Sequence, residues 1–117
     1  MNIEELREYC LSLKGVTEDF PFDESTLVFK VGGKMFCLTD LIDKFAIAIK
    51  NDPEKNIELR EEYSAVKPGY HMNKKHWNTV EIDGTIPDYM LKNLIDESYD
   101  LVVMALPRKK QLEIKYS

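Results

Sequence analysis

The chain has 117 residues, of which 44% are hydrophobic, with five glycines and five prolines; this suits one compact domain and excludes collagen-like and wholly disordered chains. No apolar run approaches the roughly 18 to 20 residues that cross a bilayer, and residues 1–5 lack the features of a signal peptide, so we expect a cytoplasmic protein with no membrane partner. Sixteen basic and 21 acidic side chains give a net charge of −5, so the protein as a whole repels polyanions and any anion-binding surface must be local.

The first predicted element is a helix over residues 2–14. Asn2 is expected to cap it, with Glu5 completing a capping box. Gly15 supplies a stop signal. Spacings of three and four residues predict one apolar stripe that docks the helix, made of Ile3, Leu6, Cys10 and Leu13.

Three strands are predicted next. Residues 26–31 alternate between two faces, and Gly32 and Gly33 predict a tight turn into a second strand at residues 34–39. Residues 44–50 alternate again and form the third predicted strand. The stretch around Pro21, which precedes these strands, is expected to be irregular.

The following segment is predicted as a helix, a loop and a strand. Asp52 and Pro53 open a short helix to about residue 63. A loop with Pro68 and Gly69 leads into a strand at about residues 76–82. The residues of the helix expected to face the core are Ile57, Leu59 and Tyr63.

The last predicted helix has the strongest pattern in the chain. Thr85 is expected to cap it, with Asp88 three residues later, and Pro107 to end it. The basic residues at 108–110 either complement the negative end of the helix dipole or bind a polyanion. Residues 111–117 are expected to form a C-terminal tail. Its predicted buried stripe is Leu91, Leu94, Ile95, Ser98, Val102 and Ala105.

Together these elements predict an α+β fold. Strands between helices, without the regular alternation of parallel crossover units, indicate a largely antiparallel sheet with the N- and C-terminal helices on one face. We see no repeat, linker or boundary, so residues 1–117 are expected to form a single domain.

Four blocks of sequence carry a family resemblance: residues 19–23 (DFPFD), 28–36 (VFKVGGKMF), 68–77 (PGYHMNKKHW) and 98–103 (SYDLVV) followed by Leu106 and Pro107. In this order they resemble the YjbR/MmcQ family of small bacterial proteins, over residues 1 to about 110. The resemblance implies a frataxin-like (CyaY-like) fold and a proposed double-wing arrangement of hairpins that binds DNA. It implies no settled biochemical activity.

The segment 66–77 favours nucleic-acid binding because it holds three lysines and two histidines but no acid. Alternation places Trp77 beside Thr79 and Glu81, on the predicted less buried side of its strand, where its ring could stack on a base. The interpretation requires that lysines of this segment and of the Gly32 hairpin converge on one surface. The candidate nucleic-acid-binding residues are Lys30, Lys34, Lys67, Tyr70, His71, Asn73, Lys74, Lys75, His76 and Trp77.

Two alternatives stand beside DNA binding. Tyr70 and Trp77 could simply cover the sheet while the lysines form a solvated rim. An adaptor could instead bind a protein or a small anion through the same patch, without catalysis.

No motif for catalysis or a cofactor is present. The sequence has no Gly-rich phosphate loop, Gly-x-Ser-x-Gly elbow or Cys-x-x-Cys pair, so we expect neither enzyme activity nor a cofactor. Cys10 and Cys37 are expected to be buried apolar residues. His71 and His76 are spaced wrongly for a zinc site. The frataxin-like resemblance makes a group of acidic residues a candidate for cation binding, but we expect their side chains to be solvated. These residues are Glu4, Glu5, Glu8, Glu18 and Asp19.

Overall fold

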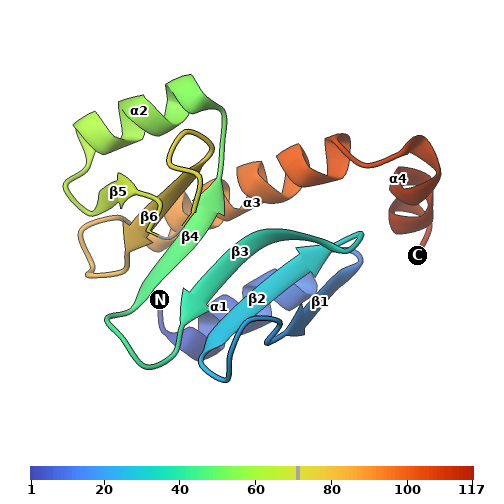
Figure 1. Cartoon of the computed structure of the whole chain (residues 1–117), viewed down its shortest axis with the longest axis horizontal. Helices are drawn as coiled ribbons and strands as arrows, with labels where there is room; N and C mark the ends of the chain where they lie inside the picture. The colour runs from blue at the N-terminus through green and yellow to red at the C-terminus, as the bar shows by residue number, and fades with distance from the viewer. Residues whose placement is uncertain (71) are drawn as a thin grey trace.

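The computed structural model of the chain describes residues 1–70 and 72–117, which form a six-stranded sheet and four helices (Figure 1). The strand order is β1-β2-β3-β4-β6-β5, and every neighbouring pair is antiparallel. The predicted α+β fold with an antiparallel sheet is therefore confirmed. The strands are β1 (Val16–Asp19), β2 (Thr26–Val31), β3 (Lys34–Asp40), β4 (Ala46–Lys50), β5 (Val66–Pro68) and β6 (Trp77–Glu81); the helices are α1 (Ile3–Ser12), α2 (Pro53–Glu62), α3 (Asp88–Met104) and α4 (Arg108–Lys115).

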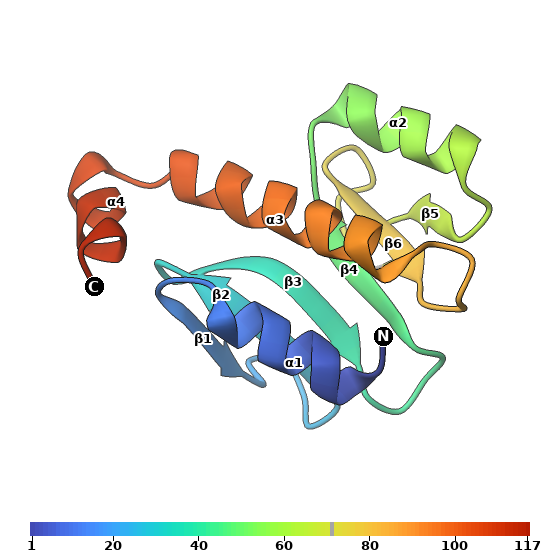
Figure 2. The ribbon, with the colours of Figure 1, turned by 180° about the vertical axis from the view of Figure 1, so that it is seen from behind.

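The helices α1 and α3 cover one face of the sheet, as predicted, and Figure 2 shows both on that side. The strands turn apolar side chains such as Phe29, Ile47 and Val80 toward them. The predicted stripe of α3 is buried from Leu91 to Val102, whereas Ala105 is exposed because the helix ends at Met104. The sheet thus has one face covered by helices and one face free of them (Figure 1).

The helix N-termini agree with local sequence signals at two of three predicted sites. Asn2 and Glu5 form the capping box of α1, and the Asp52 side chain caps α2. The Thr85 cap is wrong, because α3 begins at Asp88, directly after Pro87. Thr85 instead donates its hydroxyl to Asp83 Oδ1 at 2.6 Å, inside the preceding turn.

Four further segments differ from the prediction. Strand β1 forms within the stretch expected to be irregular, and β5 within the expected loop. Ile57 of α2 is 52% exposed, and its neighbour Asn56 is buried instead. Residues 108–115 form α4, so its cations lie in the first turn of a new helix, and Lys110 Nζ donates to the Gly32 carbonyl at 3.3 Å.

Buried polar side chains join the elements. β3 has one extra residue, Phe36, opposite the Phe29/Lys30 step of β2. Ser98 of α3 accepts a hydrogen bond from Lys50 N at 2.8 Å and donates one to the Phe36 carbonyl at 2.6 Å. A single hydroxyl on α3 therefore links β3 and β4 at the irregular position.

A second group of polar residues fixes the 69–76 loop to α2. Asn56 donates to the carbonyls of Asn51 and Lys75, both at 3.2 Å, and Asn78 donates to the Asn56 carbonyl at 3.1 Å. Arg60 reaches the carbonyl of Lys74 at 3.1 Å. The loop that was predicted to bind a ligand is thus held through its backbone.

No helix in the described part of the chain is both long and apolar enough to cross a membrane. Cys10 and Cys37 are both buried in the core, as expected.

Candidate functional site: a groove on the open face of the sheet

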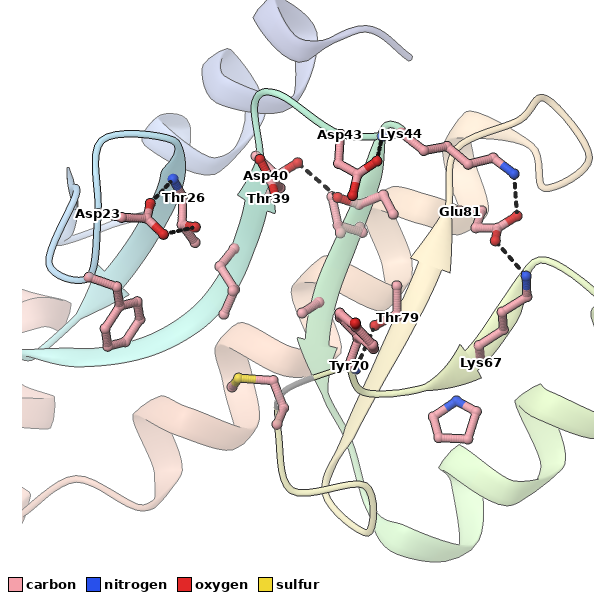
Figure 3. A pocket seen from close by; sticks show the side chains of 17 residues that line it. Asp23, Thr26, Thr39, Asp40, Asp43, Lys44, Lys67, Tyr70, Thr79 and Glu81 are labelled. Carbon is pink, nitrogen blue, oxygen red and sulfur yellow. Dashed lines mark hydrogen bonds and ion pairs between the residues drawn. The ribbon is translucent and has the colours of Figure 1, made fainter.

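A groove of about 850 Å³ lies on the helix-free face of the sheet (Figure 3). Its floor comes from alternate positions of the strands, such as Leu38 of β3, Ala48 of β4 and Thr79 of β6. Its walls are loops: residues 20–25 contribute Phe22, and the 69–76 loop contributes Tyr70. The alternation that fills the core with Phe29 and Ile47 therefore leaves a second, shallower apolar surface on the opposite side.

Aromatic side chains stand exposed beside this floor. Phe22 is 63% exposed and Tyr70 is 74% exposed. The backbone N–H of Tyr70 donates to Thr79 Oγ1 at 3.2 Å, which places the start of the loop against the floor of the groove. Large apolar surfaces that stay accessible around a concavity are typical of binding sites.

The β5 and β6 side of the groove carries an ion triad, which we call the Glu81 triad: Glu81, Lys44 and Lys67 (Figure 3). Lys67 Nζ lies 2.6 Å and Lys44 Nζ 3.4 Å from the Glu81 carboxylate. The hydrogen bond from Lys67 is the main cause that lowers the pKa of Glu81 below its ordinary value of 4.5, with Lys44 adding to it. Both lysines are therefore engaged with a carboxylate.

Replacing Lys67 with methionine should raise the pKa of Glu81 toward its ordinary value, because the largest stabiliser of its charged form is removed. A carboxyl group with a lowered folded pKa stabilises the fold above its unfolded pKa and loses that contribution as the pH falls through the folded pKa. A carboxyl ¹³C NMR titration of the wild type and Lys67→Met tests this, with Lys55→Met on the exposed surface of α2 as the control. An unchanged Glu81 titration in Lys67→Met would contradict the triad.

Three carboxylates line the opposite side of the groove, and we call them the acidic end: Asp23, Asp40 and Asp43. Backbone N–H groups of Ser25 and Thr26 bond to Asp23 and lower its pKa. Asp40 Oδ1 accepts from Ile42 N and Asp43 Oδ1 from Lys44 N, both at 2.9 Å. Within residues 1–70 and 72–117 none of the three lies in an ion pair.

The predicted lysines do not form one coherent cationic surface. Lys30 pairs with Asp19 at 3.5 Å, and Lys67 belongs to the Glu81 triad. Lys74 Nζ turns back onto the Gly69 carbonyl at 3.2 Å. Lys34 and Lys75 are exposed and have no ion-pair partner among the described residues. Lys30 and Lys67 are thus paired with carboxylates, so the predicted lysines do not all contribute to the single cationic surface that the DNA interpretation requires.

Trp77, the aromatic residue predicted to stack on a base, is covered by the loop that precedes it. Trp77 does face the side shared with Thr79 and Glu81, but it is 8% exposed, so the prediction of an available ring is wrong. A Cβ on Gly69 would lie 2.9 Å from Trp77 Cβ, which shows how closely the loop covers this residue.

The remaining candidates belong mostly to the loop backbone. Asn73 Oδ1 accepts from Lys75 N at 2.9 Å and from His76 N at 3.4 Å, so it shapes the turn. His76 is half-buried, and its carbonyl accepts from Asn51 N. His71 lies outside the described residues.

Metal binding has no support in the acidic residues near the N-terminus. Glu5 bonds to the Asn2 backbone, and Glu18 holds the Arg7 guanidinium at 2.5 to 2.9 Å. Across the described residues, no group of three or more His, Cys, Asp or Glu side chains is arranged to hold a metal ion.

Sequence reasoning missed much of the groove. Lys67 and Tyr70 were predicted site residues and do line it, whereas Phe22, Asp40 and Asp43 were not predicted. Only the block at residues 19–23 gave a signal, since it includes Phe22 and Asp23.

Comparisons with known proteins identify relatives along nearly the whole chain. The family model described as YjbR matches residues 11–101. The protein named "Uncharacterized protein YbdF" from Escherichia coli O157:H7 is 38% identical over 113 residues, covering 96% of this chain and 93% of its own length. "Uncharacterized protein YjbR" from Escherichia coli K12 is 35% identical over 112 residues, covering 95% of each chain.

Solved structures support the same relationship. The crystal structure of the Deinococcus radiodurans protein DR2400, with domain DUF419, has a TM-score of 0.92 and 40% identity, covering 97% of this chain and 88% of that one. A crystal structure of a Pseudomonas syringae protein has a TM-score of 0.76 and 27% identity, covering 86% of this chain and 98% of that one.

Proposed function

This chain belongs to the YjbR family, and from that premise we propose that it is a non-catalytic binding protein whose open-face groove holds an extended segment of a partner protein. The observation that carries the proposal is the apolar floor at Leu38 and Ala48, flanked by the exposed rings of Phe22 and Tyr70. Concave apolar surfaces with aromatic walls are suited to anchoring side chains of a bound peptide.

The dimensions of the groove fit a short extended segment. Its lining crosses five strands, β2, β3, β4, β6 and β5. Adjacent strands lie about 4.8 Å apart, so four such steps span about 19 Å. At about 3.3 Å per residue, that length corresponds to about six extended residues. The groove is therefore long enough to recognise a peptide motif.

The chemistry of the lining favours binding over catalysis. The described residues that line the groove include no histidine, cysteine or serine. Its lysines are paired with Glu81, and its aspartates accept hydrogen bonds from the backbone of their own turns. The described lining therefore offers no serine or cysteine nucleophile with a histidine base, and its Thr26 hydroxyl and Lys67 amine are held by the carboxylates of Asp23 and Glu81.

DNA binding is the second candidate, and one observation favours it. The strand register places the β2–β3 hairpin tip, with Lys34, at the same end of the sheet as the loop that carries Lys74 and Lys75. Two projecting loops at one end could both approach a nucleic-acid backbone, as the double-wing proposal requires. The paired state of Lys30 and Lys67 makes this the weaker candidate.

Selection from a random heptapeptide library displayed on phage tests the proposed function. The wild type should enrich a family of peptides, and Tyr70→Ala should bind a selected peptide about tenfold more weakly, because aromatic anchors carry much of the energy of such contacts. Fluorescence anisotropy measures the affinity. Tyr89→Ala is the matched control, since Tyr89 is 70% exposed on α3 and does not line the groove.

Two outcomes would contradict peptide binding in the groove. One is that the wild type enriches no peptides beyond those that Tyr70→Ala enriches. The other is that it enriches none but binds a 20-base-pair duplex with an affinity that falls in a Lys74→Ala/Lys75→Ala variant and not in Tyr70→Ala. That second result would support DNA binding instead, with log affinity decreasing by about one for each phosphate contact per decade of salt.

A further inference from the structure

The groove is electrically polarised along its length. The acidic end places three carboxylates on the β2 to β4 side, while the Glu81 triad leaves one positive charge on the β5 and β6 side. The lining therefore carries four carboxylates and two ammonium groups, a net charge of −2. A ligand that crosses the groove meets a negative potential at one end and an apolar floor in the middle.

We propose that the bound segment carries a lysine or arginine that sits against Asp40 and Asp43, next to a large apolar side chain that lies on Leu38 and Ala48. This inference rests on the proposed function, since it specifies the chemistry of the peptide that the groove selects. The partner is thus a protein with a short basic and apolar motif.

The acidic end has free hydrogen-bonding capacity for such a cation. Asp40 and Asp43 each use Oδ1 for a backbone N–H of their own turn. Their Oδ2 atoms have no hydrogen-bond partner within residues 1–70 and 72–117 and can accept from an ammonium or guanidinium group. The turn bonds hold both carboxylates in place before a ligand arrives, so binding does not have to order them.

The neighbouring surface suits the rest of a basic side chain. The aliphatic stems of lysine and arginine bury well on apolar surface while the charged head stays near water. Leu38 and Ala46 lie beside Asp40 and Asp43 in the same groove, and Phe22 offers an exposed ring within its walls. Acidic ligands, in contrast, would meet like charges at this end, which disfavours them.

The sequences selected by the wild type from the random heptapeptide library provide the first test. They should be enriched in lysine or arginine next to a leucine, isoleucine or aromatic residue. For one selected peptide, Asp40→Asn/Asp43→Asn should bind about five- to tenfold more weakly, because two partly exposed charge contacts are lost while the Oδ1 bonds of the turns are kept. Glu58→Gln/Glu61→Gln on the exposed surface of α2 removes the same charge and should bind as the wild type does.

A double-mutant cycle locates the contact. Replacing the basic residue of the peptide by glutamine should weaken binding to the wild type but change binding to Asp40→Asn/Asp43→Asn little. If the wild type selects peptides that Tyr70→Ala does not bind, and these show no basic enrichment or bind the double variant normally, the polarity inference fails while the proposed function stands. If no peptides are selected at all, the proposed function fails and this inference with it.

Discussion

Replacing Ser98 with alanine should lower the free energy of unfolding by about 3 kcal/mol, because the buried carbonyl of Phe36 and the part-buried N–H of Lys50 both lose their partner. Ser98 is fully buried, and its hydroxyl serves both the Phe36 carbonyl and the Lys50 N–H. The pairing of β3 with β4 ends at Cys37 and Ile49, just before Phe36 and Lys50, so the two strands do not supply replacement partners there. Urea unfolding followed by circular dichroism measures the effect.

The control for this variant is Ser12→Ala. Ser12 donates to the Tyr9 carbonyl, but it is exposed, so water replaces the lost bond and the expected change is below about 0.5 kcal/mol. A loss below about 1 kcal/mol in Ser98→Ala would mean that the two backbone groups find other partners, and the linking role of the hydroxyl would be rejected.

Asn56→Ala should be destabilising by about 2 to 4 kcal/mol, since its amide serves two carbonyls in the interior between α2 and the sheet. Asn56 is 1% exposed and donates to the carbonyls of Asn51 and Lys75. Its removal also releases the backbone of the 69–76 loop, which carries Tyr70 into the groove. We therefore expect weaker binding of a groove peptide at temperatures where the variant is still folded.

Asn93→Ala provides the comparison, because Asn93 is exposed on α3. Its stability should be within about 0.5 kcal/mol of the wild type. Amide chemical shifts of residues 73–77 separate the two effects of Asn56→Ala: large shifts indicate a displaced loop, and unchanged shifts together with unchanged stability would refute the proposed attachment.

Elements specified by neighbouring residues could be predicted from the sequence. Asn2 and Glu5 are three residues apart and form their capping box without help from the rest of the chain. Gly32 and Gly33 both adopt positive φ, which explains why the pair signalled the hairpin. The buried stripe of α3 from Leu91 to Val102 follows from helical spacing alone.

The errors arise where distant contacts decide. Asn56 rather than Ile57 is buried because its partners Lys75 and Asn78 come from residues about twenty positions later. β1 has only four residues, and its strand character comes from pairing with β2. For so short a segment, local pattern is a weak signal.

The site illustrates the same limit. Composition singled out residues 66–77 as basic, but a charge count along the chain does not show that Glu81 of β6 pairs with Lys67 of the neighbouring strand β5. Alternation along the strand predicts the correct face for Trp77, but it does not predict that the side chain is buried, because the burial depends on the loop at Gly69. The acidic end joins Asp23, from the loop before β2, and Asp40, the last residue of β3, so only the folded sheet assembles it.

The two outer strands carry a consequence for how copies of this chain behave together. β1 has four residues, and β5 has three and ends at Pro68, which has no N–H to donate. Neither border offers the long run of unpaired backbone groups on which another molecule could add a strand, which protects the protein against edge-to-edge aggregation in concentrated solution.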